Sequence, residues 1–283
     1  MKYDLMYSFA GGLGDVILQL FKISQYDQII ENTKQGKRII INLISSNPFA
    51  GELFDNMPNK KNLKVNILDY YLFCKLDPEE RQTFLKEINS EQIDLKSKYG
   101  PEAREKNGYV DFFPLDGEEE IINEIVNRVQ KENKKIIIFS PCTGKKVTTP
   151  TKEYCSKVIN YISDDFILVK IGRDYLLTEI QRYDREYIFN HKNVKDLTNT
   201  LSVPATLELV KRSNGIITSD TSIMCYGDIL DKPMFIMISD KNKDHYLNYK
   251  KHPYYQCFDK EYVIVRDWQN TDQESINKFL KLL

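Results

Sequence analysis

Short runs of consecutive apolar residues recur along the chain, separated by longer segments that have helical periodicity. Runs without alternation of polar and apolar positions are typical of strands buried on both faces of a parallel sheet. The runs expected to form strands are Tyr3–Ser8, Arg38–Ile44, Leu63–Leu68, Lys135–Phe139, Phe166–Ile171, Gly215–Thr218 and Pro233–Ile238.

The segments between these runs repeat apolar residues every three or four positions, which is the spacing of one helix face. The expected helices are Val16–Asn32, Glu79–Lys98, Glu118–Lys131, Lys152–Ile162, Ala205–Arg212 and Gln273–Leu283. Strands that alternate with helices predict an α/β fold built on parallel sheets.

The first predicted strand leads into a glycine-rich turn, Gly11-Gly12-Leu13-Gly14, and Asp15 then opens the helical segment. A strand that ends in glycines and restarts as a helix presents bare backbone N–H groups, which attract anions or hold a reacting group against the backbone. Asp15 has two interpretations here. Its carboxylate either stabilises the helix N-terminus or takes part in chemistry.

The two common phosphate-binding fingerprints do not fit this chain. Gly12 and Gly14 supply the first two glycines of the dinucleotide motif, but Ile17 occupies the third position, and no acid follows the next strand to bind a ribose. Gly144-Lys145 is followed by Lys146 rather than by Ser or Thr, so the P-loop is missing too. The sequence argues against NAD binding and ATP hydrolysis.

At 283 residues the chain is long enough for two domains. A turn-rich stretch from Asn107 to Gly117 separates the first strand–helix series from the second. We expect one Rossmann-like domain over residues 1–117 and another over residues 118–283, whose last helix can pack back on the first. Two such halves facing each other form a cleft lined by the carboxyl ends of both sheets, where ligands bind.

Two loops of the second half are expected at that edge. Ser140–Lys146 follows a strand and combines small hydroxyls, a glycine and paired lysines, which suit either an anion site or an ordinary solvated connection. Ser219–Ser222 follows the strand Gly215–Thr218 and caps the next helix, again presenting N–H groups. Each loop alone has an ordinary structural explanation.

Composition narrows the classes of protein further. Lys and Arg number 40 against 41 Asp and Glu, and this balance argues against a nucleic-acid partner. No apolar run is long enough to span a membrane and no signal peptide is evident, so peripheral membrane contact is the only kind left open. The five cysteines are scattered without a C-x-x-C pair, which predicts a reduced, cytoplasmic protein without a structural zinc site.

Taken in order, these features resemble the heptosyltransferase-like glycosyltransferases, the ADP-heptose:lipopolysaccharide family (glycosyltransferase family 9), which has two facing Rossmann-like domains in the GT-B arrangement. The matching segments are Gly14-Asp15-Val16, Lys135–Phe139, Ser140–Lys146, Thr149-Pro150-Thr151, Asp196-Leu197-Thr198, Leu207–Val210, Ser213–Ile217, Asp220-Thr221-Ser222 and Lys232-Pro233. The resemblance covers residues 3–23 and 135–240 and is stronger in the second half.

The chain departs from the family pattern after Asp220-Thr221. Ser222 replaces the usual glycine, Cys225 stands where the family has a histidine, and Tyr226-Gly227-Asp228 replaces a small-residue helix. The donor is therefore not fixed as ADP-heptose, and lipopolysaccharide is not carried over as the acceptor.

The resemblance implies an inverting transfer of a sugar from a nucleotide-diphosphate donor to a hydroxyl of an acceptor glycan or glycolipid. The first domain would be the acceptor side and the second the nucleotide-sugar side. Asp15 is the expected general base. Donor-binding residues are expected to be Gly12, Gly14, Ser140, Thr143, Lys146, Asp220, Thr221 and Ser222. No Asp-x-Asp occurs, so neither a metal nor a cofactor is expected, and backbone dipoles and lysine would stabilise the diphosphate.

Other functions stay open on the sequence. One is a nucleotide-sugar epimerase, which needs further acids or histidines in the cleft. Another is a non-catalytic nucleotide-sugar-binding member of the same fold, which the change to Cys225 allows. A third is a transferase acting on nucleic acid through the patch Lys241–Lys251, which belongs to a segment, Lys241–Tyr255, where basic and aromatic residues interleave. That segment can equally bind the donor or acceptor, or be a solvated loop.

Overall fold

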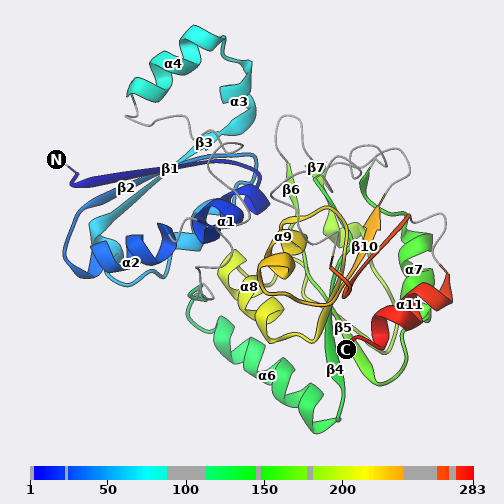
Figure 1. Ribbon diagram of the computed structural model, residues 1–283. Helices are drawn as coiled ribbons and strands as arrows, with labels where there is room; N and C mark the ends of the chain where they lie inside the picture. The colour runs from blue at the N-terminus through cyan, green and yellow to red at the C-terminus, as the bar shows by residue number, and fades with distance from the viewer. Residues whose placement is uncertain are drawn as a thin grey trace. The chain divides into compact units, whose positions relative to one another are not determined.

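The computed structural model describes residues 3–22, 25–87, 112–144, 148–176, 181–238, 260–267 and 272–283. The chain divides into two compact units. The first comprises Met1–Leu115 with Ser202–Pro204, and the second comprises Asp116–Leu201 with Ala205–Leu283. Each unit is built on its own parallel sheet (Figure 1).

The described sheet of the first unit has three parallel strands in the order β1-β2-β3. Its strands and helices are β1 (Leu5–Gly11), α1 (Leu13–Lys22), α2 (Gln25–Lys34), β2 (Ile39–Ser45), η1 (Ala50–Phe54), η2 (Lys60–Asn62), β3 (Leu63–Asp69), α3 (Tyr70–Lys75) and α4 (Pro78–Glu87). Phe9 of β1 pairs in register with Leu43 of β2, and its ring stacks on that of Phe54 with centroids 6.3 Å apart. These buried side chains are part of the core of this unit.

The segment predicted as a single helix, Val16–Asn32, is two helices, α1 and α2. The first begins earlier than expected, at Leu13, because the carbonyl of Gly12 accepts a hydrogen bond from the backbone N–H of Val16 (3.0 Å). Helix α1 ends at Lys22 and helix α2 begins at Gln25. Residues 23–24 between them lie outside the described part of the chain. The predicted helix Glu79–Lys98 is present as α4, and its remainder is also outside.

The second unit carries a six-stranded parallel sheet in the order β11-β10-β9-β4-β5-β8. Its elements are α6 (Glu118–Lys131), β4 (Lys135–Ser140), α7 (Lys152–Asn160), β5 (Phe166–Lys170), β6 (Tyr175–Leu176), β7 (Gln181–Arg182), η5 (Asp184–Glu186), β8 (Val194–Asp196), α8 (Val203–Arg212), β9 (Gly215–Thr218), α9 (Ser222–Ile229), β10 (Met234–Ile238), β11 (Val263–Asp267) and α11 (Gln273–Leu280). Strands β6 and β7 form a separate antiparallel hairpin.

Helices cover both faces of this sheet, which explains why its strands are continuously apolar. Helices α7 and α11 lie on one face, and α6, α8 and α9 lie on the other (Figure 1). On the first face, Phe139, Val158 and Phe235 share one buried cluster with Phe279 of α11. The last helix of the chain therefore packs on the sheet of the second unit. The predicted α/β fold with parallel sheets is confirmed.

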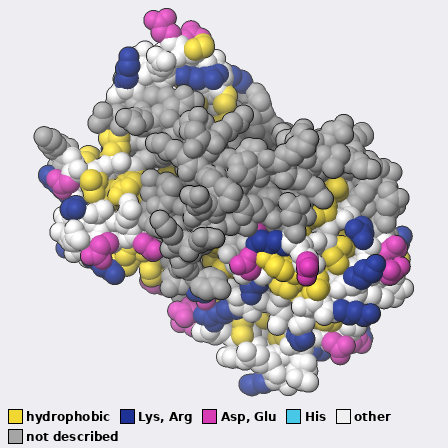
Figure 2. Space-filling model, in the orientation of Figure 1, with side chains coloured by type: hydrophobic (Ala, Val, Ile, Leu, Met, Phe, Trp, Pro, Cys, Tyr) yellow, Lys and Arg dark blue, Asp and Glu magenta, His cyan; other side chains and the backbone are white. Residues whose placement is uncertain are grey.

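The described surface mixes charges of both signs. On the face drawn in Figure 2, acidic and basic side chains are interspersed over the described residues. This agrees with the formal net charge of -1. No helix among the described residues is long and apolar enough to cross a membrane.

Candidate functional site

The order of the strands in the second unit reverses direction between β4 and β9. Numbered along the chain, the six strands follow the arrangement 3-2-1-4-5-6 of doubly wound sheets, and β4 and β9 are the first and fourth. Ligands of such sheets bind outside the carboxyl ends of the strands at this reversal point. We therefore expect a ligand-binding site at the loops that follow β4 and β9.

These two loops are bonded to each other. The Thr218 hydroxyl donates to the carbonyl of Ser140 (3.0 Å), and the Ser219 hydroxyl donates to the carbonyl of Pro141 (2.8 Å). The backbone N–H of Ser219 also donates to the Ser140 carbonyl (3.3 Å). The side chains of Ser140, Thr218 and Ser219 are fully buried. The structure thus brings together two segments that the sequence singled out separately.

Helix α9 starts at this point. Its N-cap is Thr221, whose hydroxyl accepts from the backbone N–H of Ile223 (3.2 Å) and lies 2.9 Å from the Thr218 hydroxyl. Ser222 is the first residue of the helix, and half-exposed Asp220 precedes the cap. The positive end of the helix dipole therefore lies beside the bonded loops, where it favours an anion.

The loop after β4 folds back on the residues that lead into α7. The Thr143 hydroxyl lies 2.6 Å from that of Thr148 and 3.1 Å from that of Thr149, and the backbone N–H of Thr143 donates to Thr149 (3.0 Å). The buried hydroxyl of Ser140 finds no hydrogen-bond partner in the described part of the chain. Since a buried polar group without a partner is costly, this hydroxyl is suited to an additional ligand.

A second polar group of side chains, which we call the Lys170 cluster, lies beyond β5. It consists of Lys170, Arg182, Asp184, Asp196 and Thr198. The ammonium of Lys170 is fully buried and donates to the carbonyl of Asp184 (3.0 Å), the carboxylate of Asp196 (2.9 Å) and the hydroxyl of Thr198 (2.6 Å). A buried charge with three acceptors is well compensated.

Arg182 and Asp184 form a buried ion pair inside this cluster. Burial alone would lower the pKa of Arg182, but the neighbouring Asp184 carboxylate raises it above its ordinary value. The Cys142 thiol, in the loop after β4, has a raised pKa because it is buried and because Asp184 lies close to it. The Lys170 cluster therefore adjoins the loop that leaves β4.

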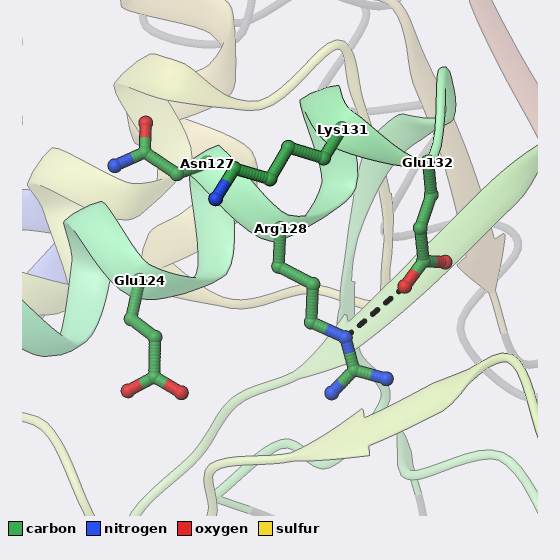
Figure 3. Close-up of a pocket in the computed structure, with 5 residues that line it drawn as sticks. All are labelled: Glu124, Asn127, Arg128, Lys131 and Glu132. Atoms are coloured by element: carbon green, nitrogen blue, oxygen red, sulfur yellow. Dashed lines mark hydrogen bonds and ion pairs between the residues drawn. The ribbon is translucent and has the colours of Figure 1, made fainter.

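A surface hollow elsewhere does not qualify as a site. It is lined by Glu124, Asn127, Arg128, Lys131 and Glu132, all from α6 or its C-cap (Figure 3). Arg128 and Glu132 are joined by an ion pair of 3.1 Å, and bonds from Lys134 and Arg128 lower the pKa of Glu132. The end of α6 leads into the start of β4, so the hollow lies away from the carboxyl ends of the strands.

Comparisons with known proteins bear on the fold. No protein-family model and no curated protein sequence matches the chain. Among solved structures, glycosyl transferase family 9 from Veillonella parvula matches with a TM-score of 0.56 at 15% identity, over 98% of this chain and 88% of that one. ADP-heptose lps heptosyltransferase II from E. coli matches with a TM-score of 0.54 at 11% identity, over 100% and 98%. E. coli heptosyltransferase WaaC with ADP-2-deoxy-2-fluoro heptose matches with a TM-score of 0.54 at 10% identity, over 98% of each chain.

The chain has the fold of these glycosyltransferases. The resemblance read from the sequence is thereby confirmed for the fold, including the predicted GT-B class.

The predicted site residues fall into three groups within this glycosyltransferase fold. Ser140, Thr143, Asp220, Thr221 and Ser222 lie in the bonded loops or at the start of α9. In the first unit, Gly12, Gly14 and Asp15 lie where β1 ends and α1 begins. Lys146 and the segment Lys241–Tyr255 lie outside the described residues. Membership of all these residues in one site stays a prediction.

One sequence-based interpretation is wrong. Tyr226-Gly227-Asp228 does not replace the helix that follows Thr221 but lies inside it, as part of α9. A β-carbon at Gly227 would come within 2.5 Å of Ile216, so the helix packs closely on the sheet at this residue. Cys225, at the position of the family histidine, is buried in the same helix. Asp228 is buried and pairs with Lys260 (3.1 Å).

Sequence reasoning did not find the Lys170 cluster. Lys170 ends an apolar run, where a lysine usually reaches solvent. Its partners Asp184 and Asp196 come from separate segments, and no local spacing connects them to it. The weak signal available was Gly172, just after the strand, since glycine often marks a close approach of another group.

Proposed function

We propose that this protein is a glycosyltransferase that moves a sugar from a nucleotide-diphosphate donor to a hydroxyl of an acceptor glycan or glycolipid. The observation that carries the proposal is the bonding of the loops after β4 and β9 at the reversal point of the sheet, beside the N-terminus of α9. Hydroxyls, backbone N–H groups and a helix dipole suit a diphosphate at such a place.

The donor diphosphate would be held by residues of both loops. In this proposal Ser140 contributes its hydroxyl, Thr221 and Ser222 contribute the backbone N–H groups at the start of α9, and Thr143 positions the first loop through its bonds to Thr148 and Thr149. Lys146 contributes the positive charge. Asp220 helps to shape the second loop. We propose that these groups stabilise the leaving diphosphate without a metal ion or other cofactor, because a preorganised dipole and an ammonium can compensate the charge that develops.

The first unit would supply the acceptor side. Asp15, with the backbone of Gly12 and Gly14 beside it, acts in this proposal as the general base. It takes the proton of the acceptor hydroxyl while that oxygen forms a bond to the anomeric carbon. The bond from the anomeric carbon to the diphosphate oxygen breaks in the same step, so the configuration inverts and the nucleoside diphosphate departs.

Nucleotide binding is the first test of the proposal. We expect ADP, GDP, UDP or CDP to bind in the presence of EDTA and to raise the melting temperature, since a ligand at about 100 times its Kd adds about 2.7 kcal/mol of stability. Lys146→Ala should weaken the binding measured by calorimetry by about 1 to 3 kcal/mol. Lys131→Ala, on the outer face of α6, is the matched control. Unchanged affinity in Lys146→Ala, or binding abolished by EDTA, would contradict the site.

Turnover separates the proposed activity from its alternatives. A nucleotide sugar that binds should release its nucleoside diphosphate only when a suitable acceptor is added, which mass spectrometry can follow. Recovery of an epimerised sugar nucleotide would favour an epimerase instead. Tight binding with no transfer to any acceptor in a broad glycan and glycolipid panel would favour a non-catalytic nucleotide-sugar-binding protein.

A further inference from the structure

A short segment that follows β7 contacts the loop after β4 at two separate places. We call this segment, Asp184–Tyr187, the η5 turn, because it consists of η5 and its C-cap. At the first place, burial and the neighbouring Asp184 carboxylate raise the pKa of the Cys142 thiol, which donates to that carboxylate. At the second, the Tyr187 hydroxyl donates to the carbonyl of Pro150 (2.7 Å). The η5 turn therefore contacts the loop both near the sheet and near the start of α7.

The η5 turn is itself anchored at Asp184. The Asp184 side chain is fully buried and pairs with Arg182, and its carbonyl accepts from the buried ammonium of Lys170 (3.0 Å). A β-carbon at Gly172 would come within 2.1 Å of the Asp184 carboxylate, so the turn packs directly on the backbone that leaves β5. The η5 turn is thus fixed to the end of a central element of the sheet.

The ring of Tyr187 is fixed as well. It packs against the core of the second unit, with its centroid 6.3 Å from that of Phe189, whose ring in turn meets Phe139 of β4 at 5.7 Å. Burial raises the pKa of the Tyr187 hydroxyl, and the nearby Cys142 thiol adds to this effect, so the hydroxyl keeps its proton and can donate. The packed ring therefore presents its hydroxyl to Pro150 in one position.

The Pro150 end of the loop is connected to the proposed diphosphate site. Thr149 precedes Pro150, and its hydroxyl accepts from the backbone N–H of Thr143 (3.0 Å). The Thr143 hydroxyl also lies 2.6 Å from that of Thr148, and all three threonines are buried. A shift of Pro150 would therefore move Thr143, which lies in the part of the loop that leaves β4.

We propose that Tyr187 is a positioning residue of the donor site, which acts through Pro150 to hold the loop after β4 in the form that binds the diphosphate. This inference rests on the proposed function, since it requires a diphosphate at that loop. A loop that is already ordered loses less conformational entropy when the ligand binds, so affinity rises. Because the effect is on the loop, it is the same for every nucleoside diphosphate.

Tyr187→Phe tests the inference, because it removes one hydrogen bond and keeps the packed ring. Tyr262→Phe is the matched control, since the Tyr262 hydroxyl donates to Asp231 (2.7 Å) just before β11, at the opposite end of the strands. Calorimetry measures the binding of ADP, GDP, UDP and CDP in the presence of EDTA. We expect Tyr187→Phe to weaken each binding nucleotide by a common factor of about three to ten, and Tyr262→Phe to bind as the parent does.

Hydrogen exchange followed by mass spectrometry tests the positioning of the loop without a ligand. The backbone N–H of Thr143 is protected by its bond to Thr149. We expect it to exchange faster in Tyr187→Phe than in the parent, because the loop opens more often when Pro150 is no longer held. Tyr262→Phe should leave the exchange of this group unchanged.

The other outcomes separate the role of Tyr187 from the proposed function. Parental affinity in Tyr187→Phe, with or without faster exchange, would overturn the positioning role and leave the proposed function standing. An equal loss of affinity in the two variants would also overturn it, because a general loss of stability would be the cause. If the parent binds none of the four nucleotides, the proposed function fails, and the positioning role fails with it.

Discussion

Lys170 unites segments that lie far apart in the sequence. Its ammonium is fully buried, a costly state that is tolerated only with good partners, and each of its three acceptors belongs to a segment outside β5. Burial alone would raise the pKa of Asp196, but bonds from Thr198 and Lys170 hold it below its ordinary range. Lys170 therefore connects the end of β5 both to β8 and to the segment that follows β7.

Lys170→Met should destabilise the protein by about 2 to 4 kcal/mol, because it leaves polar groups unpaired around a neutral side chain. The loss is limited because Asp196 is partly exposed and can bind water in place of the ammonium. Lys192→Met is the control, since Lys192 pairs with Asp164 in solvent and should contribute less than about 1 kcal/mol. Urea denaturation measures both. Equal losses for the two variants would contradict the role assigned to burial.

The same variants predict a pH effect. The pKa of Asp196 is lowered in the folded state, so its contribution to stability is present above the unfolded value of about 3.9 and is lost as the pH falls through the folded value. The difference in unfolding free energy between the parent and Lys170→Met should therefore narrow below about pH 4. A difference that stays constant down to that range would show that Asp196 is not the partner that matters.

Asp15 is the third residue of α1, and the preceding Gly12 accepts the first backbone bond of that helix. This position still permits both interpretations of its carboxylate. Asp15→Asn keeps the size of the side chain and much of its interaction with the helix N-terminus. If Asp15 is the base, turnover should fall by about 10² to 10⁴ while donor affinity stays nearly unchanged. A lower melting temperature with normal turnover would leave Asp15 a purely structural acid.

At the scale of elements, α7 and α9 begin alike but have different neighbours. Thr151 caps α7 by accepting from Tyr154, and Thr221 caps α9 by accepting from Ile223. Only Thr221 also contacts Thr218, whose hydroxyl holds the two loops together. The two caps thus compare a helix end that is bonded to both loops with one that only follows the loop after β4.

Thr221→Ala and Thr151→Ala should each cost about 1 kcal/mol of stability, the usual loss for a threonine cap. Only Thr221→Ala should also weaken nucleoside diphosphate binding, by about 1 kcal/mol or more, because it would disturb the N–H groups that we propose hold the diphosphate. Chemical denaturation and calorimetry separate the two effects. Equal effects of both variants on binding would argue against a diphosphate at the start of α9.

Elements with buried faces were predictable, and short polar ones were not. Strand β9 was expected over Gly215–Thr218 and helix α6 over Glu118–Lys131, and both have those bounds. Strand β8 has only three residues, two of them charged, so its place at the sheet edge comes from backbone pairing with β5 rather than from its side chains. The hairpin was missed because its strands have two residues each.

At the scale of the whole molecule, the sequence predicted the order of elements along the chain but could not predict which strands pair. The Ser140 and Ser219 loops were each explicable as ordinary turns, and only the pairing of β4 with β9 makes them neighbours. The strands that the pattern missed, β8 and β11, form the two edges of the described sheet. Pairing depends on contacts between distant residues, which local periodicity does not encode.

The central position of β4 and β9 has a consequence for how a ligand acts on the protein as a whole. Each of these strands is paired on both sides, whereas edge strands have one free side and open first in the small fluctuations of a native protein. Groups at the ends of the central strands separate only when most of the sheet comes apart. Unfolding that destroys a site there is global rather than local, so the binding free energy of a ligand held at these ends should appear in full in the cooperative unfolding transition.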